Sequence, residues 1–165
     1  MRKTLLLCLL FIAGCQNYDV TINDTQVYGP KRLFTNFDVD DPALRECLQQ
    51  QIADQRITGP LELELLNCSS AGIQSLQGLG LFAALKQVKF SNNGIRNLVE
   101  MGQLAQLEVI VLDNNDIVDP VPLDQLGELR VLDLSGNAKL QCPRLGRFAE
   151  VAQLTLPEHC RARDT

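Results

Sequence analysis

The 165-residue sequence contains no tryptophan and a single histidine, His159, and its six cysteines form no C-x-x-C pair. Structural zinc sites are built from several closely spaced Cys and His ligands, so a metal site is not expected. A catalytic cysteine needs a supporting base, and His159 alone offers no such constellation. The sequence therefore gives no support to a metalloenzyme or to a cysteine nucleophile.

The chain also lacks a long apolar run and an excess of basic side chains. The apolar stretch Leu5–Ile12 is too short to cross a bilayer, which takes about 20 residues. Fifteen basic side chains stand against 20 acidic ones, a net charge of −5. An acidic body has no electrostatic attraction for nucleic acid or anionic lipid. Neither a membrane-spanning segment nor nucleic acid binding is expected.

What the sequence does contain is an apolar trio, spaced L-x-x-L-x-L, that recurs at a 22-residue step. The last two apolar positions alternate with a variable residue, as in a short strand with one buried face. A fixed step of this size indicates a stacked repeat protein, whose surfaces usually bind other molecules. The five trios are Leu63-Leu66-Cys68, Leu85-Val88-Phe90, Leu107-Ile110-Leu112, Leu129-Leu132-Leu134 and Val151-Leu154-Leu156.

A second apolar rhythm, with a step of three residues, follows each of the first four trios. Side chains three apart eclipse one another in a 3₁₀ turn, so this half of each repeat should be 3₁₀-like or extended. An α-helix would instead need apolar positions at i, i+3, i+4 and i+7. The runs are Ile73-Leu76-Leu79-Phe82, Ile95-Leu98-Met101-Leu104, Ile117-Pro120-Leu123-Leu126 and Cys142-Leu145-Phe148.

An asparagine stands three places beyond the trio in three of the repeats: Asn93, Asn115 and Asn137. This position lies at the turn that leaves the strand, where backbone groups lack partners in a regular ladder. A carboxamide offers both a donor and an acceptor. We therefore predict that these asparagines satisfy the backbone of the turn and do not bind a ligand.

The central repeats read LKQVKFSNNGIRNL, LEVIVLDNNDIVDP and LRVLDLSGNAKL. They resemble the short leucine-rich repeats of internalin-type bacterial surface proteins, over about 98 of the 165 residues (63–160). The first and last copies carry Ala71 and His159 in place of the asparagine, which suits capping coils with one neighbour. The resemblance implies an α/β repeat solenoid with a parallel sheet on its concave face and a 3₁₀ or extended convex side.

The N-terminus has the basic start, apolar run and small residues of a secretory signal. Its Ile-Ala-Gly-Cys ending resembles the bacterial lipoprotein signal, which implies cleavage before Cys15 and acylation of that cysteine, for instance with palmitate. By the same resemblance, Gln16 indicates sorting to the outer membrane of the cell envelope. Cleavage leaves 13 basic and 20 acidic side chains, a net charge of −7. The alternative is an ordinary signal peptide that happens to contain a cysteine.

Export permits disulfides, and four cysteines lie beyond Cys15. Four cysteines allow three pairings. Coils stacked at about 4.8 Å place the first coil ~14 to ~19 Å from the last two, farther than the about 7 Å between Cα atoms that a disulfide spans. The spacing therefore predicts the bridges Cys47–Cys68 and Cys142–Cys160.

An amphipathic helix should cover the open end of the first coil. Asp41-Pro42 is typical of a helix N-cap followed by proline at the first position. Thr58-Gly59-Pro60 should end the helix. One face of the helix would carry Leu44, Cys47, Leu48 and Ile52, with Cys47 turned toward Cys68.

Residues 16–40 lack the repeat rhythm and contain the alternating patch Val20-Thr21-Ile22 and the turn signal Gly29-Pro30. We interpret this stretch as a tether, with one strand resting on the edge of the repeat sheet. The expected organisation is a signal peptide (1–14), a lipidated N-terminus and tether (15–40), a capping helix (41–60), a repeat domain of about five coils with a C-terminal cap (61–160) and a tail (161–165).

The outward side chains of the expected strands form columns across the concave face. An apolar cluster rimmed by polar groups is typical of a protein-contact site. However, valine favours strands whatever it touches, so the three valines of this face are open to either interpretation. The candidate partner-binding residues are Gln87, Lys89, Val109, Val111, Asp113, Val131 and Asp133.

Two functions remain open on the sequence alone. The first is a non-enzymatic, membrane-anchored lipoprotein whose concave face binds a protein in the cell envelope; the second is a structural or assembly accessory with no dedicated ligand on that face. An enzyme using Asp113 and Asp133 is disfavoured, because a carboxylate pair needs one pKa raised in a water-excluding site. No cofactor is expected. The face covers only a few hundred Å², less than the ~800 Å² per partner of a stable interface, unless loops such as 114–119 contribute.

Overall fold

The computed structural model describes residues 20–22, 25–28 and 32–161, and the chain divides into two units, Met1–Arg32 and Leu33–Thr165. In the first unit, β1 (Val20–Ile22) pairs antiparallel with β2 (Thr25–Tyr28). These two strands form a sheet of their own, and the contact of this patch with the repeat sheet stays a prediction. Two segments so near in sequence pair with each other at a small cost in chain entropy. Cys15 and the signal segment lie outside the described residues.

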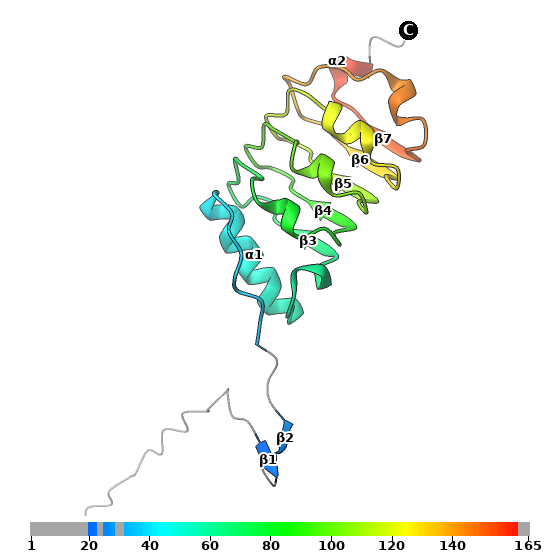
Figure 1. Cartoon of the computed structure of the whole chain (residues 1–165). Helices are drawn as coiled ribbons and strands as arrows, with labels where there is room; N and C mark the ends of the chain where they lie inside the picture. The colour runs from blue at the N-terminus through cyan, green and yellow to red at the C-terminus, as the bar shows by residue number, and fades with distance from the viewer. Residues whose placement is uncertain (1–19, 23–24, 29–31, 162–165) are drawn as a thin grey trace, which may run out of the picture. The chain divides into compact units, whose positions relative to one another are not determined.

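The second unit is a stack of coils in which each coil contributes one short strand to a parallel sheet (Figure 1). Neighbouring strands pair without stagger, so Leu66, Val88, Ile110, Leu132 and Leu154 form one continuous row. A step of 22 residues therefore returns the chain to the same place in the next coil. The strands are β3 (Leu65–Asn67), β4 (Gln87–Lys89), β5 (Val109–Val111), β6 (Val131–Asp133) and β7 (Gln153–Thr155).

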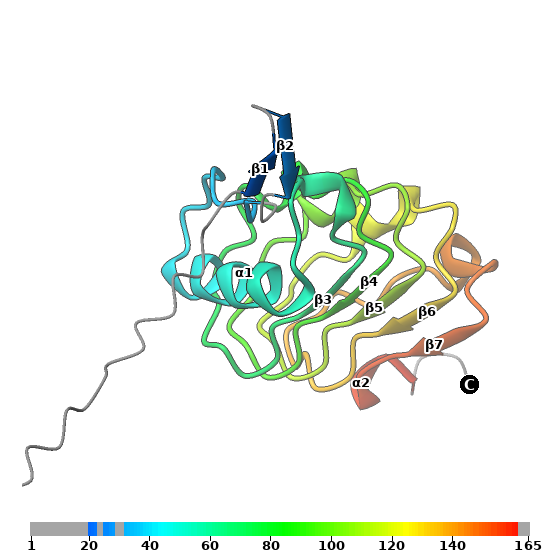
Figure 2. The ribbon, with the colours of Figure 1, turned by 90° about the horizontal axis from the view of Figure 1, so that it is seen from below.

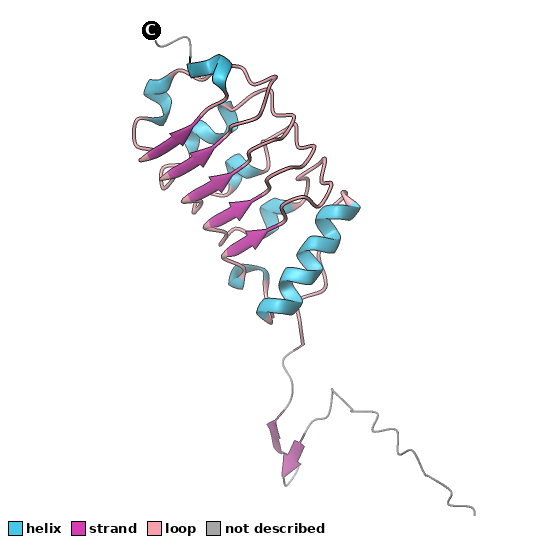
Figure 3. Cartoon of the chain, turned by 180° about the vertical axis from the view of Figure 1, so that it is seen from behind, coloured by secondary structure: helices cyan, strands magenta, loops and turns pink. Residues whose placement is uncertain are grey.

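The opposite side of the stack is made of short 3₁₀ helices and extended chain, as the step of three predicts (Figures 2 and 3). This side is thin because a 3₁₀ segment needs less width than an α-helix, which lets the coils stack closely. The helices are η1 (Pro60–Glu62), η2 (Leu79–Leu81), η3 (Met101–Gln103), η4 (Val121–Gln125) and η5 (Leu145–Phe148).

The core between the two sides is formed by the predicted apolar rows. All three residues of the first four trios are buried, with exposed fractions of 2% or less. The last coil departs from this pattern, because Val151 and Leu154 are only partly buried. Among the described residues β7 pairs with β6 alone, so the inward row of this coil is covered by a neighbouring coil on one side.

The asparagines form a ladder that joins successive coils. The amide nitrogen of Asn115 lies 2.9 Å from the carbonyl oxygen of Phe90 in the preceding coil and 3.1 Å from that of Leu112 in its own. Its side-chain oxygen accepts the backbone N–H of Ile95 at 3.1 Å. Asn93 and Asn137 make equivalent contacts. The predicted structural role is confirmed.

The N-terminal end of the stack is covered by α1 (Pro42–Gln55), whose buried residues are Leu44, Leu48 and Ile52. The helix ends in a left-handed residue, Arg56 (φ 56°), whose N–H bonds back to the last turn, so it stops before the predicted Thr58. At its start, Oδ1 of Asp41 accepts the N–H groups of the first turn at 2.9 and 3.1 Å. The predicted N-cap is confirmed.

Asp41 also holds the helix to the repeats. Its second oxygen accepts the N–H groups of Gln74 and Ser75 at 2.8 and 3.0 Å, in the return segment of the first coil. Burial raises the pKa of this carboxyl, but the four backbone N–H groups favour the charged form more strongly, so its pKa lies below the usual 3.8. One carboxylate thus caps the helix and fixes it to the stack.

Acid should therefore weaken this contact. Because the pKa of Asp41 is lower in the folded than in the unfolded chain, its contribution to stability is complete above about pH 4 and is lost as the pH falls toward the folded-state pKa. Asp41→Asn turns an NH₂ group toward the N–H donors, so it should lower the urea midpoint at pH 7 and much less at pH 3. The exposed Asp54→Asn is the control. An equal effect of Asp41→Asn at both pH values would contradict this role.

The segment that precedes α1, residues 33–40, also packs on the first coil and is called the strap below. Phe34 and Phe37 stack with ring centroids 5.9 Å apart, and both meet the edge or face of Phe82, at 6.2 and 5.7 Å. Gly78, with φ +89°, lies so close to the strap that a Cβ there would be 2.4 Å from the carbonyl oxygen of Asp38. The packed body therefore begins at Leu33, before the rhythm of the repeats.

Both predicted disulfides are present. Cys47 of α1 bonds to Cys68 with a Cα–Cα distance of 5.8 Å, and Cys142 bonds to Cys160 at 5.3 Å. Cys160 lies in α2 (Glu158–Arg161), which ends the described part of the stack. Among the described residues, no helix combines the length and apolar character that a membrane span needs.

Candidate functional site

The strand face is the surface formed by the outward side chains of β3–β7. The register places Gln87, Val109 and Val131 in one column, and Lys89, Val111 and Asp133 in the next. The three valines are half-buried, so they form a continuous apolar centre across β5 and β6. The structure thus brings the predicted candidates together on neighbouring strands.

The charged side chains of this face differ in how many hydrogen-bond partners their neighbours provide. Within the described part of the chain, Lys89 has no hydrogen-bond acceptor or carboxylate in contact, and its side chain is exposed. Asp133 accepts the N–H of Ser135 at 2.9 Å through one oxygen. Asp113 accepts the hydroxyl of Ser91 and, at 2.9 Å, the amide of Asn114. The ammonium of Lys89 is therefore open to an outside anion.

A small pocket lies at the N-terminal end of the strand face, between α1 and the first two strands. Its volume is about 220 Å³, and its lining includes Gln51 of α1 with Leu65, Asn67, Gln87 and Lys89 of β3 and β4. Leu65 is 51% exposed. Gln51 could not be identified from the repeat step, because it belongs to the non-repeating helix.

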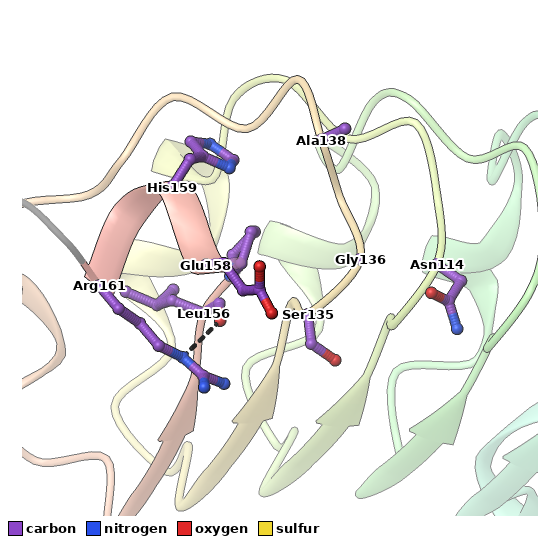
Figure 4. Close-up of a pocket in the computed structure, with 9 residues that line it drawn as sticks. Asn114, Ser135, Gly136, Ala138, Leu156, Glu158, His159 and Arg161 are labelled. Carbon is purple, nitrogen blue, oxygen red and sulfur yellow. Dashed lines mark hydrogen bonds between the residues drawn. The ribbon is translucent and has the colours of Figure 1, made fainter.

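A larger groove of about 550 Å³ lies at the C-terminal end, beside the turns that follow β5 and β6. Figure 4 shows its wall of α2 side chains, Glu158, His159 and Arg161, with Ser135 and Asn114 on the facing turns. The guanidinium of Arg161 donates to the carbonyl of Leu156 at 3.0 Å. The groove lies at the edge of the strand face where the chain leaves β5, β6 and β7, and it adds polar groups to that edge.

A ladder of alternating charge runs along the edge where the chain enters each strand. It consists of Glu64, Lys86, Glu108 and Arg130 at the 22-residue step, and Lys86 donates to Glu64 at 2.9 Å. The backbone N–H of each later member donates to the carbonyl of the one before it, at 2.8 to 2.9 Å. This ladder was detectable in the sequence, because the same step that aligns the apolar trios aligns these charges.

The cysteine and histidine side chains at the C-terminal cap lie close together. The ligand atoms of Cys142, His159 and Cys160 all lie within 4.8 Å of one another. The two sulfurs bond to each other, so neither offers a thiolate to a metal ion. His159 Nε2 is 2.9 Å from the carbonyl oxygen of Leu140, which gives the ring a role in closing the cap.

Comparison with solved structures identifies the fold. An internalin (InlF) of Listeria monocytogenes matches with a TM-score of 0.57 at 18% sequence identity, over 72% of this chain and 36% of that one. Internalin C2 of the same bacterium matches with a TM-score of 0.52 at 20% identity, over 58% of this chain and 42% of its own. No protein-family model matches the sequence, and a search of the curated proteins found no similar sequence.

The chain therefore has the fold of a leucine-rich repeat solenoid, as the repeats predict, similar to the fold of these internalins, and it spans less than half the length of those two structures. The α/β repeat class and the parallel sheet are confirmed. A fold of this kind presents its strands as a continuous surface, which is suited to contact with another protein.

Proposed function

We propose that this leucine-rich repeat protein is a non-enzymatic interaction module, held in the bacterial cell envelope by an acylated Cys15, whose strand face binds a protein partner. The observation that carries the proposal is the apolar centre of Val109, Val111 and Val131, rimmed by Lys89 and Asp133, on a face that no described element covers. Such an arrangement is typical of the core and rim of a protein interface.

The size of this surface supports a modest affinity. The strands alone cover only a few hundred Å², whereas a stable interface takes ~800 Å² per partner. The pocket beside α1 and the groove beside α2 lie at the two ends of the strand face. A partner that also enters both would approach the area of a standard interface.

The membrane attachment follows from the lipoprotein-like signal and the charge of the mature chain. A body of net charge −7 is repelled by anionic lipid, so acyl groups on Cys15 would have to supply the anchor, in the outer membrane by the identity of Gln16. Several acyl chains hold a protein stably, whereas one chain holds it only reversibly. The mass of the protein recovered from membranes should correspond to a chain that begins at Cys15 and carries acyl groups; an unmodified Cys15 would contradict the anchor.

The binding surface is tested by changing its centre. The triple variant Val109→Lys, Val111→Glu, Asp113→Ser should lose every protein that crosslinks to the wild type in intact cells, because it places charges in the apolar centre and alters its rim. The measurement is recovery of crosslinked proteins from the envelope, with the unfolding midpoint of the purified variant as a check on folding.

A matched change on the other side of the stack is the control. Val99 and Val121 are 53% and 50% exposed, and with Asp119 they provide the same residue types outside the strand face. Val99→Lys, Val121→Glu, Asp119→Ser should leave crosslinking unchanged. If the strand-face variant kept all its partners, the protein would instead be a structural or assembly accessory with a passive strand face.

A further inference from the structure

The charge of the strand face changes from positive to negative along the stack, from β4 to β6. Lys89 on β4, Val111 on β5 and Asp133 on β6 occupy one column of the sheet. At about 4.8 Å per strand, the backbones of Lys89 and Asp133 lie roughly 10 Å apart, with an apolar residue between them, and the two opposite charges do not pair with each other. Within the described residues neither has a charged partner.

The pocket at the positive end can hold an acidic side chain, whose carboxylate would meet Lys89 and whose methylene groups would meet Leu65. Lys89 shares its pocket with the amide groups of Gln51, Asn67 and Gln87 and with the exposed side chain of Leu65. An ammonium and amide N–H groups are hydrogen-bond donors that suit a carboxylate. The volume of about 220 Å³ has room for a side chain but not for a larger ligand.

The negative end suits a cation. Asp133 uses one oxygen for the N–H of Ser135, and its other oxygen has no partner in the described part of the chain. Asp113 follows the neighbouring strand β5, two residues beyond Val111. Two carboxylates beside the valines leave this end with a net negative charge.

We propose that the strand face binds a protein segment that presents an acidic, then an apolar, then a basic side chain, in that order along the stack from β4 to β6. This inference rests on the proposed function and specifies the chemistry of the partner. A partner that covers Lys89 and Asp133 removes their water, which is unfavourable unless an opposite charge replaces it. A segment that runs in the same chain direction with the reverse order places like charges together and is rejected.

The order of the two charges on the strand face can be reversed without altering the net charge of the protein. The purified mature protein and the double variant Lys89→Asp, Asp133→Lys are each used to select from a phage-displayed library of random linear peptides. The wild type should enrich peptides with an acidic, an apolar and a basic residue in one order, and the double variant should enrich the opposite order. Synthetic peptides from the first selection should bind the double variant at least about tenfold more weakly, as expected for opposed charge pairs.

Two single-charge variants test whether peptide binding depends on the charges of the strand face or only on the net charge of the protein. Arg96→Glu and Glu150→Lys change the net charge at exposed positions outside the strand face, and they should leave the affinity of the selected peptides unchanged. Enrichment of the same charge order by wild type and double variant would overturn the inference.

The failure of the inference can be told apart from the failure of the proposed function. If the triple variant at Val109, Val111 and Asp113 loses peptide binding while the charge exchange has no effect, the strand face binds proteins but does not select by charge order. If the wild type enriches no peptide above the level of the triple variant, both proposals are wrong.

Discussion

Replacement of Asn115 with leucine should lower the free energy of unfolding by about 2–4 kcal/mol, although the leucine side chain has the same branched shape as that of asparagine. The carbonyls of Phe90 and Leu112 would each keep the amide of a neighbouring asparagine, Asn93 or Asn137. The N–H of Ile95, in contrast, has only Asn115 as its acceptor among the described residues. A buried N–H without a partner costs about 1–3 kcal/mol, and the lost hydrogen bonds add to this.

Urea unfolding of the purified protein measures this effect. Asn97 is the matched control, because it is exposed and its side chain accepts one hydrogen bond, from the N–H of Val99 at 2.9 Å. Asn97→Leu should change the stability by about 1 kcal/mol or less. Similar urea midpoints for the two variants would show that the asparagine ladder does not hold the coils together. Peptide binding by Asn115→Leu should persist below its midpoint, since the ladder lies away from the strand face.

Removal of either disulfide should cost about 3 kcal/mol on the loop-closure account, since the bridges close loops of similar length, with sequence separations of 21 and 18. This is a large part of the 5–15 kcal/mol that a domain usually has. The double variants are Cys47→Ala with Cys68→Val, and Cys142→Ala with Cys160→Ala. Valine at position 68 keeps an apolar group in the row that Phe90 and Leu112 continue.

The structural consequences at the two ends should differ. At the N-terminal end, α1 is also held by its three buried apolar side chains and by Asp41, so the helix should remain in place without its bridge. At the C-terminal end, α2 has four residues, and Val151 and Leu154 are only partly buried. Hydrogen exchange should therefore show loss of protection in β7 when Cys142–Cys160 is absent, and retained protection in β3 when Cys47–Cys68 is absent. Equal loss at both ends would contradict this difference.

The features that repeat could be predicted because every coil meets nearly the same environment. The row of Leu66, Val88 and Ile110 is buried for one reason, contact with the coils on either side, and that reason recurs at each step of 22 residues. The pairing of the cysteines followed from the same step, because the distance between coils is set by strand spacing. The columns of the strand face followed as well, since side chains alternate along a strand.

The features that do not repeat left no periodic signal. The strap of Phe34 and Phe37 was interpreted as part of a tether, yet its contacts are with Phe82 and with the chain at Gly78. The second role of Asp41 depends on where the first return segment lies relative to α1, which the repeat step does not determine. For the same reason the pocket beside α1 was not foreseen: it needs Gln51 from the cap and Lys89 from the second strand.

The central claim is that a partner contacts the strand face, and photo-crosslinking from single positions in living cells tests it most directly. A photoreactive amino acid is placed at Val111, in the centre of the strand face, or at Val121, which is 50% exposed on the opposite side. We predict a discrete crosslinked protein from position 111 that is absent from position 121 and that disappears when Lys89→Asp and Asp133→Lys are added. Crosslinks from position 121 alone, or from neither position, would contradict the account.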